Sequence, residues 1–73
     1  MEITKNAFGD YLISKNGADK GYTLKIMGEY KVYNEKGNMG YISKRKNEYI
    51  SYDYFGNEME KGNFETLLLN FFK

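Results

Sequence analysis

The stretch Tyr22–Tyr33, YTLKIMGEYKVY, decides the fold class of this chain of 73 residues. Apolar and polar side chains alternate along it, and the alternation continues through Gly28 without a change of phase. One face would then carry Tyr22, Leu24, Ile26, Gly28, Tyr30 and Val32. The pattern predicts a single long β-strand that is bent or bulged at the glycine.

Short β-type runs follow downstream, separated by turn-forming residues. Turns are expected at 34–38, 44–47 and 56–57, where asparagine, glycine and charged residues gather. The return strands are then 39–44, 48–55 and 58–60. Both parities of the run 48–55 carry apolar or aromatic residues, so the sequence leaves open which of its faces points inward.

Upstream of the central stretch, the pattern indicates one more strand over 11–15. A loop over 16–21 would join this strand to Tyr22, and the first eight residues carry no decisive pattern. Consecutive strands with short connections favour an antiparallel meander.

The carboxyl-terminal segment has the period of a helix. Five apolar residues recur at i, i+3, i+4, i+7 and i+8, namely Phe64, Leu67, Leu68, Phe71 and Phe72. Asn63 stands at the N-cap position, with Glu65 in the first turn and Lys73 in the last, where each charge complements the helix dipole. A helix of about eleven residues is too short to be stable alone in water, so it must pack on the sheet.

These elements together predict an α+β fold: an antiparallel four- to five-stranded meander sheet with one C-terminal α-helix packed on one face. The whole chain, residues 1–73, would form a single small α+β domain, because a chain of this length has room for one thin core only.

The composition argues against an enzyme. The chain has neither histidine nor cysteine, which removes the imidazole base, the thiolate nucleophile and the usual zinc ligands. The carboxylates of Asp53, Glu58 and Glu60 are interpreted as charges that protect a sheet edge. We expect no catalytic residue, no metal site and no cofactor.

Two features concern the cellular compartment. The amino-terminal residues lack the basic head and apolar run of a signal peptide, and no apolar stretch is long enough to cross a bilayer. Richness in lysine and asparagine is typical of A+T-rich genomes such as those of low-GC bacteria and their phages. We therefore expect a cytoplasmic protein of a bacterial host, without a membrane partner.

A single helix is too narrow to cover such a sheet. An α-helix is about 10 Å wide, whereas four or five strands span roughly 20 Å, and nothing in the sequence covers the second face. Eight tyrosines are distributed over both strand parities, so some of them must be exposed. Tyrosine is enriched at interface hot spots, and the expected partner-binding residues are Tyr33, Tyr41, Tyr49 and Leu69.

The leading functional hypothesis is therefore a non-enzymatic protein-binding module. Its partner would be a host protein that it inhibits or modulates, in the manner of a phage- or mobile-element-encoded anti-defence protein such as an anti-CRISPR. A homodimeric structural protein, in which two copies cover each other's exposed face, is an alternative.

The one basic cluster supports a different alternative. It comprises Lys44, Arg45 and Lys46 in one turn, with Lys36 nearby in the sequence. Beside Tyr41 and Tyr49, this turn would hold a phosphate backbone while the rings stack on bases. The protein would then be a small single-stranded nucleic-acid-binding domain, although the formal net charge of +1 gives no strong field for a polyanion.

Overall fold

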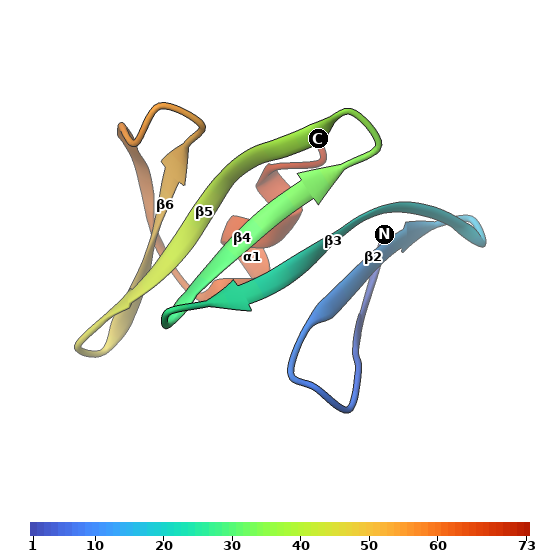
Figure 1. Cartoon of the computed structure of the whole chain (residues 1–73), viewed down its shortest axis with the longest axis horizontal. Coiled ribbons are helices and arrows are strands. Elements are labelled where there is room, and N and C mark those ends of the chain that lie inside the picture. The colour runs from blue at the N-terminus through green and yellow to red at the C-terminus, as the bar shows by residue number, and fades with distance from the viewer.

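A computed structural model describes residues 1–73 as seven strands in one antiparallel sheet and a single α-helix (Figure 1). The strands are β1 (Glu2–Lys5), β2 (Tyr11–Lys15), β3 (Ala18–Ile26), β4 (Glu29–Asn34), β5 (Gly37–Arg45), β6 (Glu48–Asp53) and β7 (Glu58–Gly62), and the helix is α1 (Phe64–Asn70). They follow one another across the sheet in sequence order, as a meander. The predicted α+β class, antiparallel sheet and C-terminal helix are confirmed, but the sheet has seven strands rather than four to five.

The central stretch folds as a hairpin and not as one long strand. Ile26 pairs directly with Glu29, so only Met27 and Gly28 form the turn. Both turn residues have positive φ, 51° at Met27 and 83° at Gly28, as a type I′ turn requires. Methionine is not a residue type that indicates such a turn. Because the alternation of apolar and polar residues continues through Met27 and Gly28, the pattern predicted one strand instead of a hairpin. The hairpin directs the apolar residues of β3 and those of β4 toward opposite faces of the sheet.

The division of 22–33 into β3 and β4 adds one strand, and of two further differences upstream the second adds another. Asn16 and Gly17 form another two-residue turn, because Lys15 pairs with Ala18, and the loop predicted over 16–21 is therefore mostly part of β3. The amino-terminal residues form the edge strand β1 against β2. A strand of four residues is stable only through its partner, and a local pattern does not reveal that partner.

The helix is capped as predicted but is shorter. The Asn63 side-chain oxygen accepts a hydrogen bond from the Thr66 backbone N–H over 2.8 Å, which satisfies one of the free donors at the helix start. The helix ends at Asn70 after seven residues rather than about eleven. The next two backbone N–H groups bond to carbonyls three residues back, which tightens the last turn, and Lys73 lies outside the helix. No helix of the structure has the length and apolar character needed to cross a membrane.

The core lies between α1 and one face of the sheet. Its five buried hydrophobic side chains are Ile13, Val32, Ile42, Leu67 and Leu68. Phe64, Phe71 and Phe72 pack against them, so the predicted apolar stripe is confirmed as the packing face of the helix segment. Two glycines leave room for the last two rings: Gly21 lies beneath Phe72. Gly40 lies beneath Phe71 in the same way.

Asp53 organises the turn between β6 and β7. The strand predicted over 48–55 ends at this residue, and the following four residues form the turn. The Asp53 carboxylate accepts hydrogen bonds from the backbone N–H groups of Phe55 and Asn57, each over 2.9 Å, and from the Asn57 side-chain amide over 3.2 Å. These bonds, with the Asn57 backbone N–H contributing most, lower the pKa of the Asp53 carboxyl below its ordinary value.

Replacing Asp53 with alanine is expected to destabilise the fold at neutral pH and to matter little in strong acid. A carboxyl whose pKa is lowered in the folded state contributes stability above its unfolded pKa, and that contribution is lost as the pH falls through the folded pKa. Urea unfolding at about pH 7 and at about pH 2 measures the difference. Asp19→Ala, which removes an exposed carboxylate from β3, is the control. An equal loss for Asp53→Ala at both pH values would contradict this role of the carboxylate.

Candidate protein-binding face

The face of the sheet turned away from α1 is the candidate functional site, and we call it the open face. In Figure 1 the helix lies behind β3, β4 and β5, and the face toward the viewer has no helix on it. The strand order runs from β1 to β7 without pairing of the two edge strands, so the sheet is not a closed barrel. No helix therefore covers the open face, although two side chains on it, Ser43 and Ile50, are only 6% and 8% exposed.

Strand register defines which residues share the open face, because directly paired residues project on the same side of a sheet. Two rows of side chains cross its centre from β3 to β7. The first row is Leu24, Lys31, Tyr41, Tyr52 and Glu58, and the second row is Ile26, Glu29, Ser43, Ile50 and Lys61. Beside the first row, on β2, β3 and β4, lie Leu12, Tyr22 and Tyr33.

Two pairs of tyrosines stack across neighbouring strands of the open face. The ring centroids of Tyr22 and Tyr33 are 5.2 Å apart, with 12° between the ring planes. Those of Tyr41 and Tyr52 are 4.7 Å apart, with 16° between the planes. The Lys31 Nζ lies 5.1 Å from the centroid of Tyr41, which is a cation–π distance. Because each ring is held by its neighbour, the rings lose little rotamer freedom when a partner covers them.

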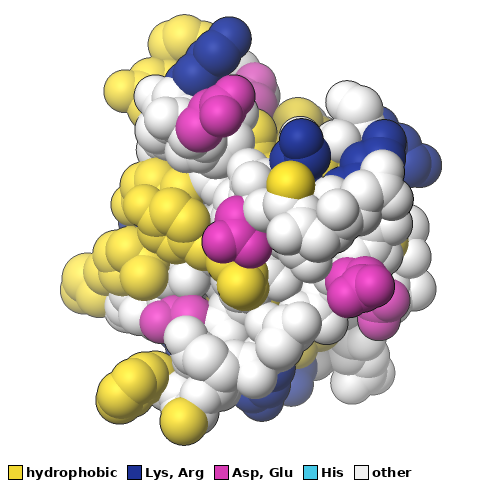
Figure 2. All heavy atoms as spheres, turned by 90° about the vertical axis from the view of Figure 1, so that its right-hand side faces the viewer, with side chains coloured by type: hydrophobic (Ala, Val, Ile, Leu, Met, Phe, Trp, Pro, Cys, Tyr) yellow, Lys and Arg dark blue, Asp and Glu magenta, His cyan; other side chains and the backbone are white.

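Aliphatic side chains extend this aromatic surface toward β2. Leu12, Leu24 and Ile26 are 41%, 38% and 42% exposed, and Tyr22 is 44% exposed. In Figure 2, where the open face forms the left edge of the molecule, hydrophobic side chains gather along that edge. Contiguous exposed apolar patches of this kind mark interaction sites more often than chance.

Charges in the middle of the open face are paired within the chain. Glu29 accepts a hydrogen bond from the Ser43 hydroxyl over 2.9 Å, and its other carboxylate oxygen lies 3.9 Å from Lys31 Nζ. Both charged side chains remain partly exposed, so the ion pair by itself stabilises the fold little. A partner that covers the face, however, meets a neutralised pair rather than an isolated charge.

The structure separates the four residues that the sequence predicts for partner binding. Tyr33 and Tyr41 lie on the open face. Tyr49 lies on the helix-covered face, where its ring packs edge-on against Phe64 at a centroid distance of 5.4 Å. Leu69 lies half-buried in α1. Only the first two therefore share a surface.

Most residues of the open face could not be assigned to it from the sequence. The alternation groups Tyr22, Leu24 and Ile26 with residues of β4. The hairpin instead sends these three to the open face, while Tyr30 and Val32 of β4 pack under the helix. The one sequence signal for this assignment is Gly28. Taken as the second residue of a two-residue hairpin turn, it places Tyr22, Leu24 and Ile26 on the face opposite to Tyr30 and Val32.

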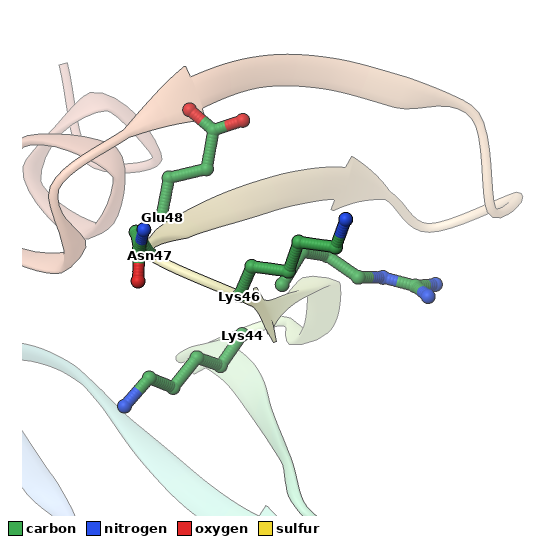
Figure 3. Close-up of a pocket in the computed structure, with 5 residues that line it drawn as sticks. Lys44, Lys46, Asn47 and Glu48 are labelled. Carbon is green, nitrogen blue, oxygen red and sulfur yellow. The ribbon is translucent and has the colours of Figure 1, made fainter.

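The predicted basic residues do not form one patch. Lys44, Arg45 and Lys46 lie at the turn between β5 and β6. Lys36 lies in the turn at the other end of β5, roughly 25 Å away along the strand. Figure 3 shows Lys44 and Lys46 extending in different directions. The shallow hollow at this turn has no hydrophobic side chain and is lined by Lys44, Arg45, Lys46, Asn47 and Glu48.

No group of three or more metal-ligating side chains is arranged so that it could hold a metal ion. No protein-family model, curated protein or solved structure matches this chain. The interpretation of the open face therefore depends on its own geometry and chemistry.

Proposed function

We propose that this chain is a non-enzymatic protein-binding module and that the open face is its binding surface. The observation that carries the proposal is the two tyrosine stacks, which lie beside exposed aliphatic side chains on a sheet face that no helix covers. Tyrosines at interface hot spots supply large contact areas, and stacked rings do so at small entropic cost. The paired central charges lower the penalty for desolvating the face.

The role of the module follows from the occupant of the face. A host protein as occupant would make the module an inhibitor or modulator, as an anti-defence protein encoded by a phage or mobile element is. A second copy as occupant would make the protein a homodimer. Both roles use the same residues, so one experiment can identify the occupant.

Photo-crosslinking from the open face, in cells that produce the protein, tests the proposal. Tyr22 is replaced by p-benzoylphenylalanine, and the matched control carries the same replacement at Tyr54, an exposed tyrosine in the turn after β6. We expect protein adducts to be several-fold more abundant from position 22, because only that position lies on the open face. Denaturing gels measure the yield, and mass spectrometry identifies the second chain.

Equal adduct yields from the two positions, or no adduct from either, would overturn the proposal. An adduct between two copies would identify the homodimer as the functional form. An adduct with a different protein would instead identify the target of an inhibitor.

The open face does not favour a nucleic-acid partner. Tyr41 and Tyr49, the two rings of that hypothesis, project from opposite faces of the sheet. On the open face the acidic residues Glu29, Glu48 and Glu58 balance the basic residues Lys31, Arg45 and Lys61. Affinity for a single-stranded oligonucleotide that falls steeply with salt, and that weakens when Arg45 and Lys46 become alanine, would replace the proposed function with nucleic-acid binding.

A further inference from the structure

We infer that the occupant of the open face is a second copy of this chain, packed face to face about a twofold axis that runs across the strands between the two central rows. The inference rests on the proposed function, since it names the partner of the same surface. Three features support it: the chemistry of the two rows, the area of the face and the thinness of the core.

The two rows complement each other most clearly on β3, β4 and β7. A twofold axis between them exchanges the rows, so each first-row residue faces the second-row residue of the same strand in the second copy. On β3, Leu24 then faces Ile26 of the second copy. On β6, Tyr52 faces Ile50 of the second copy. The exposed apolar contact is therefore the one on β3, because Ile50 and Ser43, which face Tyr52 and Tyr41 of the second copy, are only 8% and 6% exposed.

The central charges select this axis over the other twofold axis in the plane of the sheet. Across the proposed axis, Lys31 faces Glu29 of the second copy, and the reverse contact forms by symmetry. An axis along β4 would set Lys31 against Lys31 and Glu29 against Glu29, and like charges in an interface are unfavourable. At the β7 edge, Glu58 faces Lys61 of the second copy across the proposed axis.

The dimensions of the molecule allow the open face to form an interface of up to standard size. The molecule measures 33 × 25 × 20 Å, and Figure 1 looks down its shortest axis onto the sheet. A rectangle that encloses a broad face therefore covers roughly 800 Å², which is an upper limit for the face and about the area that one partner contributes to an interface of standard size. Two twisted sheets pack with their strands about 30° apart, so the correspondence between rows is closest at β3, β4 and β5, near the centre of the sheet.

The thin core gives a physical reason for self-association. Only six hydrophobic side chains are buried in the single chain. The sequence contains no cysteine for a disulfide, and no metal site strengthens the fold. Small chains without such links commonly gain stability from oligomerisation. Covering the open face with a second copy would turn the exposed rings and aliphatic side chains into a second core layer.

Exchanging the central charges tests the partner and the axis together. Analytical ultracentrifugation of the wild-type chain is expected to show a dimer at micromolar concentration. Lys31→Glu and Glu29→Lys each create two like-charge contacts in the dimer, and each is expected to raise the dimer dissociation constant about tenfold or more. An equimolar mixture of the two variants is expected to regain the dimer, because both central contacts between the two chains then join a carboxylate to an ammonium group.

The matched control is Lys44→Glu, which makes the same charge change at an exposed position on the other face and is expected to leave association unchanged. Circular dichroism verifies that each variant is folded. If a charge variant fails to fold, Leu24→Lys is used in its place. The new ammonium group would face Ile26 of the second copy and weaken the dimer. A dimer dissociation constant unchanged by Leu24→Lys would contradict the proposed interface.

A wild-type chain that stays monomeric up to about millimolar concentration, or a mixture that does not regain the dimer, would overturn the inference. The two proposals fail separately. A monomer that crosslinks from position 22 to a different protein excludes the second copy and keeps the protein-binding function. A monomer without adducts would contradict both the homodimer and the protein-binding function.

Discussion

Replacing Leu68 with alanine is expected to leave a large fraction of the protein unfolded at room temperature. The Leu68 side chain is fully buried between α1 and the sheet, among Ile13, Val32 and Ile42. A leucine-to-alanine change in such a site lowers the free energy of unfolding by about 2–5 kcal/mol. A chain of this length without disulfide or metal has roughly 3–5 kcal/mol in total. Urea unfolding followed by circular dichroism measures the loss.

Leu69→Ala is the matched control, because it makes the same chemical change at the next position of the same helix. Leu69 is only half-buried, so a clearly smaller loss is expected. Both variants must be compared with wild type at one protein concentration, because self-association would add to the apparent stability. Equal losses for the two variants would mean that α1 does not pack through the predicted apolar stripe.

Gly40→Ala is expected to lower the free energy of unfolding by about 3 kcal/mol or more. Gly40 has a φ of 144°, a conformation that L side chains rarely adopt. An added Cβ would also overlap the backbone carbonyl oxygen of Tyr52 and come within 3.0 Å of the Phe71 ring. The ring can shift, but the carbonyl oxygen belongs to the sheet and cannot move without disturbing the β5–β6 pairing. Thermal and urea unfolding measure the loss.

Gly9→Ala separates the steric part of this effect from the conformational part. Gly9 also has a positive φ, 87°, but an added Cβ there would meet no atom within 4 Å. It is therefore expected to lose only the conformational part, about 1 kcal/mol. If Gly9→Ala were as damaging as Gly40→Ala, the steric overlap with the Tyr52 carbonyl oxygen would not be the cause.

The fold and the proposed binding function use different faces of the same strands. On β4, Val32 belongs to the core under α1, whereas Lys31 and Tyr33 belong to the open face. Substitutions in the core should therefore reduce stability first, whereas those on the open face should reduce binding first. The partly exposed ion pair contributes little to folding, which makes Lys31 a suitable position for separating the two properties.

Only part of the candidate site could be predicted from the sequence. An excess of tyrosine and a single short helix are enough to predict an uncovered face, because a helix is narrower than a sheet of several strands. The residues of that face could not be assigned. A two-residue turn at Met27 and Gly28 shifts the parity of the chain by one position, so Tyr22 and Tyr30 project from opposite faces although their positions differ by an even number.

The helix could be located from the sequence because its period, its Asn63 cap and its apolar stripe are all local signals. The antiparallel class follows in the same way from the short connections, and the exclusion of imidazole and thiol chemistry follows from composition. The number of strands, and the face on which each tyrosine lies, were decided by tertiary structure. Alternation with a period of two marks two faces of a strand, but only the packing of a distant helix determines which of them is covered.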